Sequence, residues 1–171
     1  MSYYGWEPPY NQWNSHYPGP ERPRQFKNRQ QFMMDLERGL HGEAEAIAFY
    51  TSLLRMAPDD LARRNIRHAL EDERKHYRQF SELYRQLTGM SPEVPIPPPA
   101  VIPDYRKGLI EAFEDELEAA ELYRGMYLNA LTRAVRDLMF EIMTDEMEHA
   151  DRFALLYAAT KEDLEEEEKE D

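Results

Sequence analysis

The sequence contains no cysteine, which excludes disulfide bonds, thiolate-bound zinc and cysteine-ligated iron–sulfur clusters. It also lacks a basic N-terminal stretch followed by an apolar run, the pattern of a secretory signal. No apolar run approaches the roughly 20 residues that a membrane-spanning helix needs. We therefore expect a cytoplasmic protein that does not enter the membrane.

Positive charge is scarce as well. The chain has 21 basic against 34 acidic residues, a net charge of −13, which argues against nucleic-acid binding because that requires a basic face. Part of this charge is local, since segment 161–171 alone carries eight acidic and two basic side chains. We expect that segment to be a solvated, disordered acidic tail.

Regular periodicity is missing from residues 1–28, which are rich in proline, glycine and aromatic residues. We expect a disordered arm without a core of its own. Two interpretations of the arm stay open. It is either an unstructured leader or a segment that binds a protein partner, because tyrosine and tryptophan are common anchors at interfaces.

The remaining sequence shows helical periodicity and no competing strand pattern, so the predicted class is all-α. Pro58 separates the first two helices, Gly89 ends the second, and Asp59 or Asp60 and Asp104 are candidate N-caps. Helices are expected over about 30–57, 60–88, 105–130 and 132–160. They form two hairpins, 29–88 and 104–160, joined by a crossover at 89–103.

Proline dominates the crossover, with six prolines in fifteen residues. Such a segment favours extended polyproline II and spans ~45 Å at ~3.1 Å per residue. A helix of about 25 residues is ~37 Å long. The crossover is therefore long enough to run the full length of a four-helix bundle.

The two hairpins repeat a pattern at an offset of 73 residues. Each half carries Glu-x-x-Ala-x-x-x-Tyr followed by Asp-Glu-x-x-His, and the two glutamates of each half are 30 residues apart. The repeated glutamates and histidines fall within the apolar helix faces. At a 1.5 Å rise per residue, all four glutamates come to one level near mid-bundle, with both histidines one turn further on. The predicted cluster is Glu43, Glu73, His76, Glu116, Glu146 and His149.

Four carboxylates inside an apolar bundle cannot all ionise unaided, because burial and mutual repulsion both oppose it. Two divalent cations neutralise them, and neutral imidazoles complete the ligand set, which is the arrangement of di-iron and di-manganese bundles. A mixed carboxylate and imidazole set suits iron or manganese. Zinc is a redox-silent alternative. We predict two metal ions, iron first.

Several neighbouring side chains have two interpretations. Tyr50 and Tyr123 either hydrogen-bond the carboxylates or only pack in the core. Asp72 and Asp145 either orient the histidines or are surface acids. Other candidates are expected at the surface, or in the arm for the last of them: Glu45, Glu71, Glu114, Glu118, His41, His68 and His16.

Over about residues 30–160, the paired motifs EDERKH and TDEMEH, each preceded by a glutamate one helix earlier, resemble the ferritin-like superfamily. Within it, the chain is similar to rubrerythrin-like and bacterioferritin-like di-iron proteins. The resemblance implies that Glu73 and Glu146 bridge both metals. It implies that Glu43 and His76 hold one metal, that Glu116 and His149 hold the other, and that Fe(II) is oxidised by dioxygen or hydrogen peroxide.

The sequence departs from these families in three places. Ala119 stands where rubrerythrins carry an extra carboxylate, a cysteine-ligated rubredoxin domain is missing, and LEEEEKED is a poor substitute for the fifth helix of cage ferritins. The departures put a rubrerythrin peroxidase cycle and an iron-storage shell in doubt. They also require a separate electron-donor protein. The family often pairs, so we expect a homodimer.

Two other functions stay open. One is a structural or interaction protein, spore-coat-like in the composition of its arm, whose bundle is a scaffold. The other is a manganese catalase.

Overall fold

The computed structural model describes residues 29–170, with side chains described through residue 160. The arm over 1–28 lies outside the described residues. Four helices are present: α1 (Arg29–Met56), α2 (Asp60–Thr88), α3 (Tyr105–Leu128) and α4 (Arg133–Glu170). No strand occurs within residues 29–170. The predicted all-α class with four helices is confirmed.

Local signals set the boundaries of α2. The Asp59 carboxylate accepts a hydrogen bond of 2.7 Å from the Ala62 backbone N–H, which satisfies one of the free donors at the helix start. At the other end, Gly89 adopts the left-handed conformation with φ 78°, which a residue without a side chain adopts at little cost. The candidate caps Asp59 and Gly89 therefore act as the sequence indicates.

The second hairpin is capped in the same manner. The Asp104 carboxylate accepts a hydrogen bond of 2.9 Å from the Lys107 N–H at the start of α3. The Thr132 hydroxyl accepts one of 3.2 Å from the Val135 N–H at the start of α4.

The C-terminal boundary differs from the expected one. Helix α4 does not end near Thr160 but continues to Glu170, through most of the segment expected to be a disordered tail. The segment 161–170 contains neither glycine nor proline, and glutamate and lysine are good helix formers. The helix therefore meets no residue that would end it.

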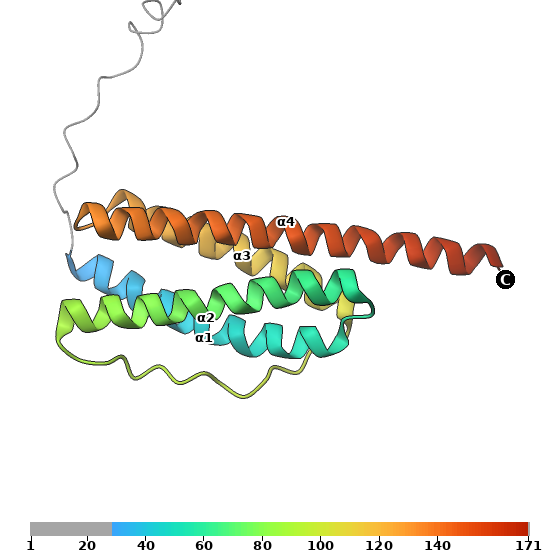
Figure 1. Ribbon diagram of the computed structural model, residues 1–171, viewed down its shortest axis with the longest axis horizontal. Coiled ribbons are helices and arrows are strands. Elements are labelled where there is room, and N and C mark those ends of the chain that lie inside the picture. Colours follow the sequence, from blue (N-terminus) through green and yellow to red (C-terminus); the bar gives the residue numbers. More distant parts are fainter. Residues whose placement is uncertain (1–28, 171) are drawn as a thin grey trace, which may run out of the picture.

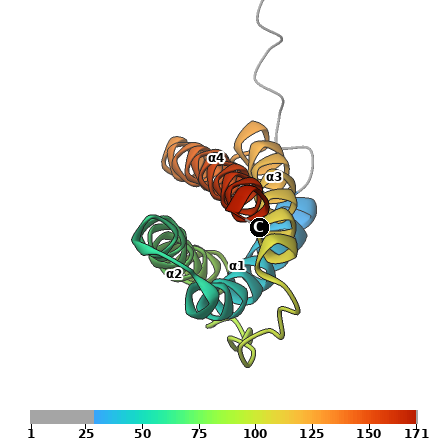
Figure 2. The same ribbon diagram turned by 90° about the vertical axis from the view of Figure 1, so that its right-hand side faces the viewer.

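The four helices surround a common axis (Figures 1 and 2). Helix α1 packs against α2 and α3, and α4 packs against α3 and α2. The crossover leaves the end of α2 and runs along the outside of the bundle to the start of α3, as its length predicts (Figure 1). None of the helices described is long and apolar enough to cross a bilayer.

Side-chain contacts fasten the crossover to the bundle. The Tyr77 hydroxyl donates a hydrogen bond to the Val94 carbonyl oxygen, and Val94 itself is buried. Further along, Ile102 packs so closely on Gly108 that a Cβ atom at that position would lie 2.8 Å from the Ile102 Cγ2 atom.

The apolar core forms two clusters. The first contains Phe32 and Leu36 of α1 with Met139 and Ile142 of α4, and the second contains Leu53 of α1 with partners from the other three helices. On α2, α3 and α4 the predicted polar residues lie between the residues of the two clusters, and on α1 Glu43 lies at the end of the first cluster, just before Ala44. The buried polar side chains therefore form one layer between two apolar layers.

Candidate dinuclear metal site

All six predicted ligand side chains lie in this middle layer. Helices α1 and α3 each contribute one glutamate, and α2 and α4 each contribute a glutamate and a histidine one turn apart. None of the six is more than 3 % exposed. Burying so many ionisable groups together is unfavourable unless their charges are balanced.

The six side chains form two overlapping groups, each with ligand atoms close enough together to hold one metal ion. One group contains Glu43, Glu73, His76 and Glu146, and the other contains Glu73, Glu116, Glu146 and His149. Within each group, one donor atom from every residue lies within 4.8 Å of the others. Glu73 and Glu146 belong to both groups, so their carboxylates lie where two ions would share them.

Each histidine turns its Nδ1 atom toward the carboxylates. The His76 Nδ1 atom lies 3.2 Å from a Glu146 oxygen and 3.7 Å from a Glu43 oxygen. The His149 Nδ1 atom lies 3.0 Å from a Glu73 oxygen and 3.4 Å from a Glu116 oxygen. Both rings thus present the same nitrogen to the interior of the site.

The outer ring nitrogens face the two aspartates whose role the sequence leaves open. The His76 Nε2 atom lies 3.1 Å from Asp145, and the His149 Nε2 atom lies 3.4 Å from Asp72. Each contact joins the two hairpins. A carboxylate on Nε2 holds the proton there and leaves Nδ1 as the ligating nitrogen.

The two tyrosines also reach across to the opposite hairpin. The Tyr50 hydroxyl donates a hydrogen bond of 2.7 Å to Glu116, and the Tyr123 hydroxyl donates one of 2.5 Å to Glu43. Burial raises the pKa of both phenols well above the ordinary value, so they remain protonated donors. Each therefore fixes one oxygen of an outer glutamate, in addition to packing in the core.

Without a metal, protons balance the charge. Burial raises the pKa values of Glu43 and Glu116 well above the ordinary value, and the charge of Glu73 raises them further. Burial acts in the same direction on Glu73, but the facing histidines outweigh it and lower the Glu73 pKa. The surrounding carboxylates raise the pKa values of His76 and His149 although burial opposes this.

Several buried oxygen and nitrogen atoms in the layer make no hydrogen bond. Within the described side chains they include one oxygen each of Glu43, Glu73 and Glu146, and the Nδ1 atom of His76. Buried polar atoms normally make hydrogen bonds, so a group of buried oxygen and nitrogen atoms that face one another without hydrogen bonds fits a bound cation. Oxygen and nitrogen atoms converging on two points suit two divalent cations. The residues present fit the predicted metal pair.

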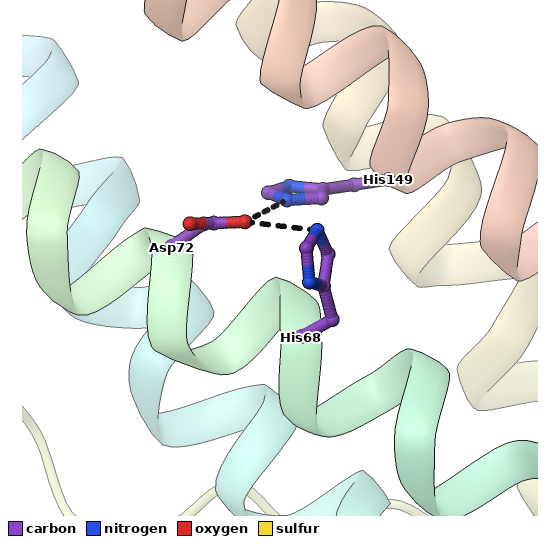
Figure 3. Close-up of side chains that lie close together, drawn as sticks. All are labelled: His68, Asp72 and His149. Atoms are coloured by element: carbon purple, nitrogen blue, oxygen red, sulfur yellow. Dashed lines mark hydrogen bonds and ion pairs between the residues drawn. The ribbon is translucent and has the colours of Figure 1, made fainter.

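The surroundings of the two histidines differ. His68, which the sequence assigns to the surface, is 44 % exposed, but its Nε2 atom lies 3.2 Å from the same Asp72 oxygen that faces His149 (Figure 3). On the other side, Lys75 approaches Asp145 at 3.7 Å and pairs with Glu141 at 2.6 Å. The four-residue spacing of His68 and Asp72 on one helix is the sequence signal for the first contact.

The remaining candidates lie at the surface, as expected. The exposed residues are Glu45, Glu71, Glu114, Glu118 and His41. His16 lies outside the described residues. Near Glu45 and Glu118, partial burial and several glutamates, Glu111 first, raise the pKa of Asp115 to about 6.

Comparison with known proteins supports the architecture. No family model matches the chain. The chain is similar to the uncharacterized protein YhjR of Bacillus subtilis (strain 168). The two are 27% identical over 135 residues, which cover 79% of this chain and 92% of the relative. A solved structure described as a ferritin-like, diiron-carboxylate protein of Bacillus anthracis str. Ames is similar with a TM-score of 0.62 and 20% identity. The likeness covers 74% of this chain and 95% of that one. The chain therefore has a ferritin-like fold.

Proposed function

We propose that the protein holds two iron ions in its middle layer and oxidises Fe(II) with dioxygen or hydrogen peroxide, in iron handling or in defence against oxidative stress. One observation carries the proposal: two overlapping four-residue groups of buried carboxylates and imidazoles share Glu73 and Glu146. The solved structure of similar fold is described as a diiron-carboxylate protein, which supports iron.

In this proposal Glu43 and His76 would hold one ion, Glu116 and His149 would hold the other, and Glu73 and Glu146 would be shared by both. The mixed oxygen and nitrogen ligands favour iron or manganese over magnesium and calcium. The two ferrous ions supply two electrons, the number that reduces one peroxide to water or one dioxygen to peroxide. The cysteine-free chain has no iron–sulfur centre to return these electrons, so a separate electron-donor protein is part of the proposal.

The chain's own side chains prepare the site for this chemistry. Tyr50 and Tyr123 hold the outer glutamates by one oxygen each, which leaves the other oxygen to bind a metal. Asp72 and Asp145 fix the imidazole orientation from behind. The apolar layers above and below keep bulk water from the carboxylates, which strengthens electrostatic interactions within the site.

An anaerobic Fe(II) titration followed by addition of air or peroxide tests the proposal. We expect two Fe(II) per chain, and then a ferric absorbance in the near ultraviolet. The double variant Glu73→Gln/Glu146→Gln should lose both, because it removes the two shared charges while keeping side-chain size. Glu71→Gln/Glu114→Gln, which removes the same charge from exposed positions, is the matched control and should behave as the parent.

Circular dichroism should show that all three proteins are folded, so that loss of iron is not loss of structure. Tight zinc binding without iron oxidation would contradict the redox function. A strong preference for manganese with peroxide disproportionation would replace ferrous oxidation by a catalase reaction.

A further inference from the structure

A cavity of about 630 Å³ leads from the molecular surface to the ligand layer between α1 and α3. Its inner end is lined by all four ligand glutamates and by Tyr50 and Tyr123. Its outer part is lined by exposed residues of both helices and by Pro97, Pro98 and Ala100 of the crossover. The cavity therefore reaches the ligand layer from this side, while the ligand glutamates at its inner end stay at most 3 % exposed.

Acidic residues surround the outer part of the cavity. Glu45 of α1 and Glu118 of α3 occupy equivalent positions, each two residues beyond an outer ligand glutamate. Glu111 and Asp115 add two more carboxylates, and the lining also contains Arg38 and His41. With all of them ionised and His41 neutral, the four carboxylates and Arg38 carry a net charge of −3. We call Glu45, Glu111, Asp115 and Glu118 the acidic mouth.

Buried carboxylate oxygens at the inner end also suit a cation. Glu43, Glu73 and Glu146 line the cavity and are at most 2 % exposed. Each has an oxygen that makes no hydrogen bond in the described part of the chain and faces a histidine Nδ1 atom, at 3.7, 3.0 and 3.2 Å respectively. Carboxylate oxygens thus occur at both ends of the cavity.

The opposite side of the layer, between α2 and α4, is occupied by paired side chains. Asp72 and Asp145 lie behind the histidine rings, and Lys75 spans the two helices to Glu141. A cation approaching there would meet the Lys75 ammonium and the donor side of the imidazoles. On the α1–α3 side, four outer carboxylates accompany Arg38, the one arginine or lysine among the lining residues.

We propose that divalent metal ions enter the site between α1 and α3, captured first by the acidic mouth and then passed through the cavity to the ligand glutamates. This inference rests on the proposed metal site and specifies how its ions arrive. Charged, low-dielectric clefts raise the local concentration of oppositely charged ligands and increase association rates by about 10- to 1,000-fold.

The rate of Co²⁺ binding, measured by stopped-flow absorbance in the absence of an oxidant, tests the proposed entry path. Co²⁺ changes colour when it binds. Glu45→Gln/Glu118→Gln should slow loading by roughly three- to tenfold at low salt, with the difference shrinking as salt screens the charges. The final Co²⁺ stoichiometry should be unchanged. Glu71→Gln/Asp151→Asn removes the same net charge from exposed positions of α2 and α4 and should load at the parental rate.

A steric variant provides an independent test. Gly42 lines the cavity, and a Cβ atom added there would meet nothing within 4 Å, so the first atom of a side chain has room at this position. Gly42→Leu should narrow the cavity and slow loading at both low and high salt.

Equal loading rates for the parent, Glu45→Gln/Glu118→Gln and Gly42→Leu, with intact stoichiometry, would overturn the entry path and leave the metal site standing. A parent protein that binds no Co²⁺ and no Fe(II) would overturn the metal site itself, and the path with it.

Discussion

At the scale of single residues, the hydroxyls of Tyr50 and Tyr123 connect the two hairpins through the outer glutamates. Each tyrosine belongs to one hairpin and hydrogen-bonds the glutamate of the other. The aspartate–histidine contacts cross in the same way. The orientation of every outer ligand therefore depends on the correct pairing of the hairpins.

Replacing Tyr123 by phenylalanine removes the hydrogen bond to Glu43 while keeping the aromatic packing on Phe80. We expect a loss of about 10- to 100-fold in affinity for one of two Co²⁺ ions, because ligand-orienting partners have effects of that size. A competition titration against a chelator measures it. Tyr84→Phe, at the edge of the same apolar cluster, is the control. Equal affinities in the two variants would show that Tyr123 only packs.

At the scale of the helices and their connections, the position of the crossover depends on the close packing of Ile102 against Gly108 of α3. The space at Gly108 is filled by Ile102 of the crossover and by Leu53 of α1, whose nearest atoms would lie 2.8 and 2.9 Å from an added Cβ atom. Both contacts are shorter than van der Waals packing allows. A side chain at this position must displace the side chains of Ile102 and Leu53.

We expect Gly108→Ala to lower the free energy of unfolding by about 1–3 kcal/mol, the usual cost of overpacking. Gly125 lies on the same helix with open space around its Cα, so Gly125→Ala should instead raise it by roughly 0.5–1 kcal/mol. Urea unfolding of the metal-free variants measures both changes. A Gly108→Ala protein as stable as Gly125→Ala would contradict the packing of Ile102 on α3.

Sequence patterns predict most of these elements because the signals are local. Asp59, Gly89 and Asp104 act within a few residues of their positions, and the six prolines of the crossover favour an extended conformation. The predicted end of α4 near Thr160 is wrong, because charge density does not prevent a helix when good helix formers continue to Glu170.

The sequence also predicts some features of the candidate site and not others. Helical spacing predicts which glutamates and histidines share a level, since rise per residue is fixed. It does not predict which hairpin supplies the hydrogen-bond partner of Tyr50 or Asp72, because that depends on how two helices rotate against each other. For the same reason, the contact of His68 with Asp72 and the cavity between α1 and α3 required the three-dimensional structure.

At the scale of the whole molecule, one polar layer interrupts the core between two apolar clusters. Its charge must be balanced by protons or by metal ions. Protonation of Glu43, Glu116 and the two histidines is favoured in the metal-free fold. Metal ions replace those protons, so binding should strengthen as pH rises.

This balance predicts how stability depends on pH. The folded pKa values of these four groups lie above their unfolded values, so the folded metal-free protein binds more protons than the unfolded chain. Its stability should therefore fall as pH rises from about 5.5 to about 8. The lowered pKa of Glu73 acts in the opposite direction, but only in more acidic solution, around the ordinary glutamate pKa.

Calorimetry in the presence of a chelator measures this slope, and saturation with metal should abolish or reverse it because bound cations take the place of the protons. A metal-free protein whose melting temperature rises over the same pH range would contradict the charge balance described for the layer.

The most direct test of the central claim is anomalous diffraction at the iron edge from crystals loaded anaerobically with Fe(II). We predict two anomalous peaks roughly 3.5–4 Å apart, the spacing of two-metal sites, with Glu73 and Glu146 between them. One peak should lie beside Glu43 and His76, and the other beside Glu116 and His149. A single peak, or peaks away from these six side chains in protein that has taken up iron, would contradict the account.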